Sequence, residues 1–229
     1  MPTAAELEIL ALSLKVALVG LLASLPFAIA VAFVLARKQF FGKTLFDAFV
    51  HLPLVLPPVV VGFGLLVLFG TQGPIGKLLA PLGIVFIFKW TGAALAAAIM
   101  GFPLLVRAVR LAIEAVDPRL ELAGRTLGAS RTRVFFTITL PLAMSGVITG
   151  GLLAFARALG EFGATITFVS NIPGETQTLP LAIYTYTQMP GGDALALRMS
   201  LFSIALSLGA LALSEWLVRR RSPADARHD

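Results

Sequence analysis

Long apolar segments alternate with short polar ones along most of this 229-residue chain. A helix needs about 20 apolar residues to cross the roughly 30 Å hydrocarbon core of a bilayer. Segments near that length occur five times, so the pattern predicts five membrane-spanning helices, at 16–36, 52–69, 90–106, 134–156 and 199–218. Two weaker stretches, 78–88 and 162–186, are short or interrupted, which is typical of re-entrant or outer-surface elements. The second of them leaves room for a sixth span.

The composition excludes a soluble domain. Hydrophobic residues make up 58% of the chain, charged residues only 13%, and the mean hydropathy is +0.92. The first ten residues contain two glutamates and no basic residue, so they do not have the positive front of a cleavable signal peptide. We therefore predict an all-α integral membrane protein with one transmembrane domain over residues 1–229. Five helices, or six, would cross the membrane.

Basic residues are concentrated in the polar segments that follow the first, third and last apolar runs. The positive-inside rule then places these segments in the cytoplasm and the amino terminus outside. The polar tail, residues 219–229, is accordingly expected at the inner surface of the cell membrane. The net charge of +6 is thus a signal of topology. Nucleic-acid binding is not expected, because the positive residues are divided among loops next to the membrane.

The polar segment between the third and fourth runs has the signals of a short helix. Asp117 supplies an oxygen for the free amides at a helix start, and the ring of Pro118 is already set to a helical φ. Gly128 is a natural stop, and Ser130 is suited to cap the next helix. About ten residues lie between these marks, or roughly 15 Å of helix. One face of it holds Leu120, Ala123, Gly124 and Leu127.

This segment resembles the EAA loop of ABC importer permeases, because Gly128 is followed by nine residues and then Ile138-Thr139-Leu140-Pro141. The positions that give the motif its name hold Leu122, Ala123 and Gly124, with Glu121 one place early. In that family the loop docks into a cleft on a separate cytoplasmic ATPase, and the resemblance implies the same role for residues 117–131. The alternative is an amphipathic helix on the membrane surface. The candidate coupling residues are Asp117, Pro118, Leu120, Glu121, Leu122, Ala123, Gly124, Leu127 and Gly128.

Three prolines interrupt the second apolar run, at Pro53, Pro57 and Pro58. Each removes a backbone donor and clashes with the preceding turn, so the helix must bend or break there. In a membrane such a break persists only against protein or a water-filled cavity. Pro57 and Pro58 are therefore candidates to line a transport pathway. A kinked packing helix explains the prolines equally well.

The fourth run and the residues after it carry two further patterns. Gly146 and Gly150 form a GxxxG motif, which lets helices approach closely within or between subunits. Arg157 and Glu161 lie four residues apart on one helix face, where an unpaired charge in the bilayer costs about 2.5 kcal/mol or more. We expect these two to pair, and a structural ion pair is favoured over a substrate ligand.

A stretch rich in hydroxyl groups follows this pair, with Thr165, Thr167 and Ser170 nearest to it. Such side chains offer contacts weak enough to pass a hydrated anion without trapping it. The alternative is that they are ordinary helix-end and turn residues. Together with Pro57, Pro58 and Glu161 they form the set of pathway candidates.

The features above resemble the molybdate-importer permeases over nearly the whole chain, from about residue 12 to 216. The most specific phrase is Gly-Glu-Phe-Gly-Ala-Thr-Ile-Thr-Phe-Val-Ser-Asn-Ile-Pro-Gly-Glu-Thr, residues 160–176. Sulfate and thiosulfate permeases share its opening but not its continuation. The resemblance implies a type I ABC importer permease fold and import of molybdate, together with tungstate, by alternating access. The implied partners are a second copy of the chain, two cytoplasmic ABC ATPase subunits and a periplasmic or surface-tethered binding protein.

The chain is not expected to be an enzyme. Gly76-Lys77 comes closest to a phosphate-binding loop, but no glycine stands five residues earlier and Leu78 follows. We find no Ser-His-Asp arrangement and no HExxH, and neither a metal nor another cofactor is expected. ATP hydrolysis would therefore take place on a partner subunit. A sulfate or thiosulfate permease and, less favoured, an ion-coupled secondary transporter are the alternative functions.

Overall fold

The computed structural model describes residues 3–221, and every regular element in that part of the chain is helical. This confirms the predicted all-α class. The elements are α1 (Ala4–Arg37), α2 (Lys43–Val55), α3 (Pro58–Phe69), α4 (Pro74–Leu79), η1 (Ala80–Leu82), α5 (Trp90–Ala115), α6 (Pro118–Thr126), α7 (Arg131–Val134), η2 (Phe135–Thr139), α8 (Leu140–Leu142), α9 (Met144–Leu159), α10 (Gly163–Val169), α11 (Leu179–Thr187) and α12 (Asp193–Arg221). The segment η2 is a π-helical turn.

Three helices in the described residues are long and apolar enough to cross a membrane: α1, α5 and the 193–210 part of α12. Two more candidates are helix pairs with a sharp bend. The α2–α3 pair bends by 112°, and the segment Arg131–Leu142 bends by 68° against α9. By length and composition, the described residues thus hold three candidate spans, or up to five if each bent pair forms one span. The count of five remains a prediction.

Two helices begin earlier in the chain than the apolar runs predicted. The first run was expected from residue 16, but α1 begins at Ala4, where Thr3 and Glu6 form a reciprocal capping box. The last run was expected from residue 199, and α12 begins at Asp193. Of the predicted tail, residues 219–221 continue the backbone of α12, and residues 222–229 lie outside the described part of the chain.

The proline-rich second run breaks as predicted, since α2 ends at Val55 and α3 begins at Pro58. The fourth run was expected as a single helix over 134–156, which is wrong. The chain instead makes the π-helical turn η2, passes Pro141 and bends at Ala143 before α9 starts. Proline at 141 has no amide hydrogen to donate, which favours a break in the ladder of helical hydrogen bonds at this place.

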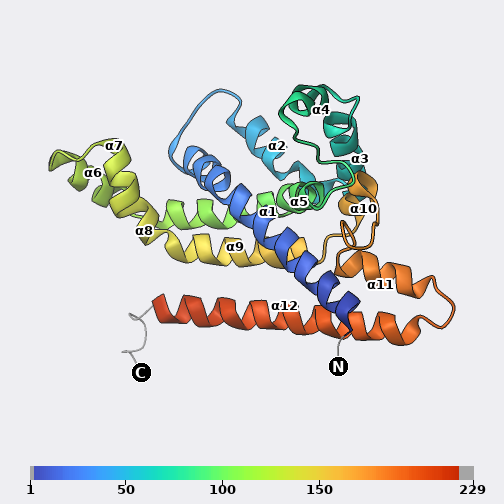
Figure 1. Cartoon of the computed structure of the whole chain (residues 1–229). Helices are drawn as coiled ribbons and strands as arrows, with labels where there is room; N and C mark the ends of the chain where they lie inside the picture. Colours follow the sequence, from blue (N-terminus) through green and yellow to red (C-terminus); the bar gives the residue numbers. More distant parts are fainter. Residues whose placement is uncertain (1–2, 222–229) are drawn as a thin grey trace.

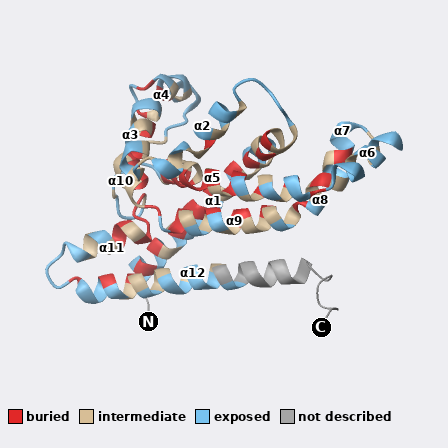
Figure 2. Ribbon diagram, turned by 180° about the vertical axis from the view of Figure 1, so that it is seen from behind, coloured by how far each residue is buried: buried red, intermediate tan, exposed pale blue. Residues whose placement is uncertain are grey.

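The centre of the molecule is a bundle of α1, α5 and α9, and α12 lies against α9 and α11 (Figure 1). At one end α6 and α7 project away from the bundle. At the opposite end lie α3, α4, α10 and α11. Buried residues are concentrated where α1, α5 and α9 meet, whereas α6 is exposed or half-buried along its length (Figure 2).

Small side chains let the three central helices approach closely. Ala28 and Ala32 of α1 are fully buried in one core cluster with Val109 of α5. A Cβ atom at Gly146 would collide with the Cβ of Ala112, and one at Gly150 would lie 2.9 Å from the Cβ of Ala108. The GxxxG motif therefore packs α9 closely on α5 within one chain. Close packing of helices is what this motif predicts.

This packing predicts that Gly146→Ala destabilises the protein, because the added methyl group has no room against α5. Overpacking typically lowers the free energy of unfolding by about 1–3 kcal/mol. The measurement is thermal unfolding of the purified protein in detergent. Gly151→Ala in the same helix is the matched control, since a Cβ there meets only Leu21 at an ordinary 3.8 Å. Equal midpoints for the two variants would contradict the packing.

Candidate functional site

The helix α6 has the limits that the sequence predicts. The carboxylate of Asp117 accepts a 2.8 Å hydrogen bond from the amide of Arg119, and Pro118 is the first helical residue. At the other end Gly128 adopts a φ of +86°, which glycine tolerates without strain. Its amide donates to the carbonyl of Arg125 and the amide of Ala129 to the carbonyl of Gly124, a Schellman closure. Ser130 caps α7 by accepting from the amide of Arg133.

The predicted apolar face of α6 is divided between two sides. Gly124 faces inward, because a Cβ atom there would lie 2.8 Å from the Cδ1 of Ile138. Leu120 and Leu127 are instead exposed, at 47% and 88%, and so is Ala123. Leu122 is also exposed, at 55%. The outward side of α6 therefore carries exposed apolar side chains, together with Arg119 and Thr126, that nothing in the described chain covers.

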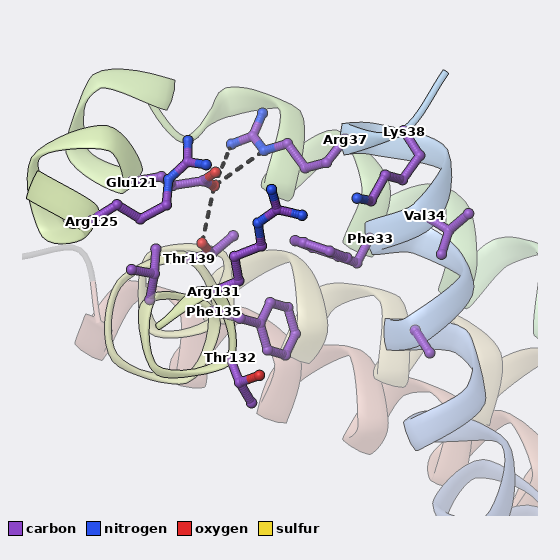
Figure 3. A pocket seen from close by; sticks show the side chains of 12 residues that line it. Phe33, Val34, Arg37, Lys38, Glu121, Arg125, Arg131, Thr132, Phe135 and Thr139 are labelled. Atoms are coloured by element: carbon purple, nitrogen blue, oxygen red, sulfur yellow. Dashed lines mark hydrogen bonds and ion pairs between the residues drawn. The ribbon is translucent and has the colours of Figure 1, made fainter. Parts of the chain in front are cut away.

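An open cleft of about 650 Å³ lies between the end of α1, α6, α7 and η2 (Figure 3). Cationic side chains line the part nearest the loop, and apolar side chains line the part that continues along the spans. The lining residues are Ala30, Phe33, Val34, Arg37, Lys38, Glu121, Arg125, Arg131, Thr132, Val134, Phe135 and Thr139.

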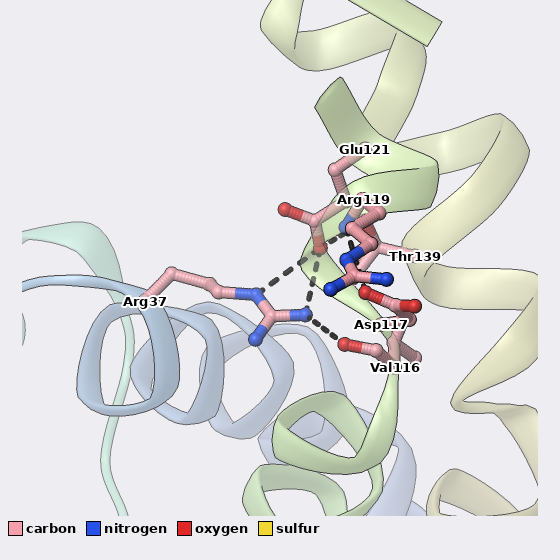
Figure 4. Close-up of polar contacts among 6 residues, drawn as sticks. All are labelled: Arg37, Val116, Asp117, Arg119, Glu121 and Thr139. Carbon is pink, nitrogen blue, oxygen red and sulfur yellow. Dashed lines mark hydrogen bonds and ion pairs between the residues drawn. The ribbon is translucent and has the colours of Figure 1, made fainter. Parts of the chain in front are cut away.

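The carboxylate of Glu121 joins α6 to three other elements (Figure 4). One oxygen of Glu121 accepts hydrogen bonds from Nη2 and Nε of Arg37, at 2.9 and 3.1 Å, and from the hydroxyl of Thr139 at 3.0 Å. Nη2 of Arg37 also donates to the carbonyl of Val116 at 2.8 Å. Both charged side chains are only about 15% exposed. The contact thereby links the end of α1, the end of α5, α6 and η2.

The position of Glu121 separates it from the other candidate coupling residues. Sequence reasoning grouped it with the docking leucines, whereas its carboxylate faces into the protein. The partner Arg37 was missed, because it lies 84 residues away and nothing in a single sequence pairs the two. Their opposite charges, each next to a predicted span, are the only signal that the sequence holds.

The pathway candidates come from two segments that the fold brings together. Pro57 precedes α3 and Pro58 is its first residue. The helices α3 and α10 then pack backbone to backbone, since a Cβ at Gly62 would lie 2.6 Å from the carbonyl oxygen of Ala164. A Cβ at Gly163 would likewise lie 2.8 Å from the Cβ of Pro58. The broken second run and the hydroxyl-rich stretch are therefore direct neighbours.

Glu161 is almost fully buried, and each of its carboxylate oxygens faces a different polar group. The expected pair with Arg157 is present, with 2.6 Å between Nη1 and Oε2. The other oxygen accepts a 2.8 Å hydrogen bond from the amide of Ala164, at the start of α10. An ion pair that also satisfies a helix-start amide has a clear structural purpose.

The three hydroxyl candidates differ in their surroundings. The hydroxyl of Thr167 donates to the carbonyl of Gly163 within α10 at 2.8 Å, as in an ordinary helix, and Thr165 is buried. Ser170 is exposed and has a φ of +64°, an uncommon conformation for a residue other than glycine. The hydroxyl of Thr176 donates to its carbonyl and holds this turn. Of the three, Ser170 alone is both exposed and in an unusual backbone conformation.

Comparison with known proteins gives a consistent result. The sequence model of the family described as "Binding-protein-dependent transport system inner membrane component" matches residues 24–223. The molybdenum transport system permease protein ModB of Escherichia coli K12 is 60% identical over 93% of this chain and 94% of its own length. The protein of the same name from Haemophilus influenzae is 58% identical over 94% of each chain. Sulfate transport system permease proteins are more distant relatives, at 36–39% identity.

Solved structures share the fold. A bacterial alginate ABC transporter, crystallised with an alginate pentasaccharide-bound periplasmic protein, superimposes with a TM-score of 0.76 at 18% identity. The match covers 97% of this chain and 81% of that one. At this identity the likeness concerns the fold alone. With the family match over most of its length and relatives near 60% identity, the chain belongs to the family of binding-protein-dependent transport system inner membrane components.

Proposed function

We propose that this chain is the membrane-spanning permease subunit of an ATP-driven importer that moves molybdate, and with it tungstate, into the cell. The observation that supports this most strongly is the 60% identity to a molybdenum permease over 93% of this chain, against 39% to a sulfate permease over 77% of it. The chain itself would supply the pathway, without catalysing a reaction. A binding protein would deliver the anion outside, and two ATPase subunits would act beneath a homodimer of this chain.

The outward side of α6 supports its role as the coupling helix. Leu120, Leu122 and Leu127 are exposed. Their helix, α6, lies with α7 at one end of the molecule (Figure 1), beside the cleft that Arg37, Lys38, Arg125 and Arg131 line. Exposed apolar groups beside charged ones suit a protein partner. We place this end, with residues 117–131 and the tail from 219, in the cytoplasm and the amino terminus outside. Closure of the ATPase pair would then move α6 and rock the spans between two states.

The contact between Glu121 and Arg37 supports a second part of this mechanism. A helix with no buried residue transmits force only if it is fastened to the spans. The carboxylate of Glu121 fastens α6 to α1 and η2, and Arg37 extends the link to the end of α5 through the carbonyl of Val116. We therefore assign Glu121 and Arg37 as positioning residues for coupling rather than as groups that touch the ATPase.

The substrate assignment predicts ATP-dependent uptake of radiolabelled molybdate into proteoliposomes that hold this subunit, its ATPase and its binding protein. Excess unlabelled tungstate should abolish uptake, because the two dianions share charge and nearly share size, whereas excess sulfate should leave it largely intact. Competition by sulfate would move the protein to the sulfate branch. Uptake that persists without ATP, or that stops when an ionophore collapses the ion gradient, would contradict an ABC importer.

The docking role predicts that Leu122→Asp lowers substrate-stimulated ATP hydrolysis by about tenfold or more, because an uncompensated charge would be buried in an apolar contact. The side chain is exposed, so the variant should still insert and fold. Leu122→Met is the matched control and should retain coupling. Gly128→Pro should also uncouple ATP hydrolysis from the substrate. Proline cannot adopt the φ of +86°, and it has no amide hydrogen to donate to the carbonyl of Arg125. Normal hydrolysis in Leu122→Asp and Gly128→Pro would remove the docking role.

The positioning role predicts a non-additive double-mutant cycle. Glu121→Gln and Arg37→Gln should each lower transport per ATP hydrolysed, and the double variant should be no worse than either, with a coupling energy of about 0.5–3 kcal/mol. Binding of the ATPase in a pull-down should stay at the wild-type level, because the leucine side of α6 is unchanged. Additive losses, or loss of ATPase binding with Glu121→Gln, would show that these residues do not act as a linked pair behind the docking surface.

A further inference from the structure

We propose that the cleft between α1, α6, α7 and η2 binds an anionic phospholipid. The phosphate group would lie among the cationic side chains at the loop end of the cleft, and an acyl chain would follow its apolar wall along α1. The volume of about 650 Å³ and the open side leave room for a headgroup with the first part of its chains. Basic pockets between membrane helices are a recognised form of anionic lipid site.

Charge is the first support for this site. Four cationic side chains line the cleft, and they face one carboxylate, Glu121, whose bound oxygen is already shared by Arg37 and Thr139. Among the residues that the structure describes, Lys38, Arg125 and Arg131 take part in no ion pair. Three positive groups therefore converge on one hollow without a counter-charge of their own.

The order of side chains along α1 is the second support. Phe33 and Val34 line the cleft one turn before Arg37 and Lys38, and Ala30 lies a further turn back, so the wall changes from apolar to cationic toward the end of the span. The facing wall holds Val134 and Phe135, and the ring of Phe135 lies edge-to-face on Phe33 with centroids 4.9 Å apart. A cationic end joined to an apolar wall matches a phospholipid, which is anionic at its head and apolar below it.

Two other occupants fit less well. A free oxyanion, such as phosphate or transported molybdate, would use only the cationic end and leave the apolar wall uncovered. A partner protein would meet the outward side of α6 first, where Leu120, Leu122 and Leu127 are exposed, whereas Glu121 lines the cleft. Lipid binding at this cleft is independent of the proposed cargo and of the proposed docking surface, so a protein that binds no lipid here would leave both proposals unaffected.

The test is native mass spectrometry of the permease, alone and in complex with its ATPase, after addition of phosphatidylglycerol, cardiolipin or phosphatidylcholine. Wild-type protein should retain the two anionic lipids in preference to phosphatidylcholine. The double variant Lys38→Gln/Arg131→Gln should lower that retention by about fivefold for each charge removed. The matched control is Arg119→Gln/Arg133→Gln, which removes two charges from the same loop at positions outside the cleft and should retain lipid like wild type.

The same experiment separates the possible occupants. Inorganic phosphate, molybdate and lipid-free glycerophosphate at millimolar concentration should not displace the bound lipid, because none of them reaches the apolar wall. Displacement by these anions would assign the cleft to a free oxyanion and overturn the proposal. If the two double variants retained equal amounts of anionic lipid, the binding would reflect general attraction to the basic surface, and the proposal would be overturned. Loss of lipid on addition of the ATPase would show that the partner covers the cleft, and would overturn the proposal as well.

Discussion

Close approach of α1, α5 and α9 is the constraint on which the rest of the structure depends. Lipid tails are as apolar as leucine, so helices in a membrane gain little from hydrophobic attraction and need intimate contact instead. Alanine and glycine supply it here, with Ala28, Ala32, Gly146 and Gly150 at the contacts. Because these three helices are held against one another, the places where α1 and α5 end are also set. Everything at the α6 end of the molecule is built on those two helix ends.

The helix α6 is held by different means, since it buries no residue of its own. Its two caps define its length, and the carboxylate of Glu121, together with the packing of Gly124 on Ile138, defines its place. An ion pair that is mostly removed from water is retained only when further hydrogen bonds satisfy it, and Thr139 and the carbonyl of Val116 provide them. The result is a helix with one fastened side and one free apolar side, which suits an element that passes movement from one protein to another.

Local features were predictable from the sequence and distant pairings were not. Asp117, Pro118 and Gly128 act on neighbouring amides and carbonyls, so the limits of α6 follow from adjacent residues. The break at Pro57-Pro58 and the pairing of Arg157 with Glu161 follow for the same reason. The start of α1 was missed although its signal, Thr3 with Glu6 three residues on, is present in the sequence. The contact of Glu121 with Arg37 depends on how whole helices pack, and the split of the α6 face depends on the same packing.

The π-helical turn η2 restricts which insertions and deletions the sequence of this region can accept during evolution. A π turn holds one residue more than an α turn would need, and Thr139, the last residue of this turn, donates its hydroxyl hydrogen bond to Glu121. Deleting a single residue from 135–139 would restore α-helical winding and turn the preceding segment by about 100° relative to α9. The link from α6 to the bundle would then be out of register. The number of residues between Gly128 and the bend at Ala143 is thus fixed by geometry, so a one-residue insertion or deletion would displace α6 as a whole, whereas a substitution changes only the contacts of one side chain.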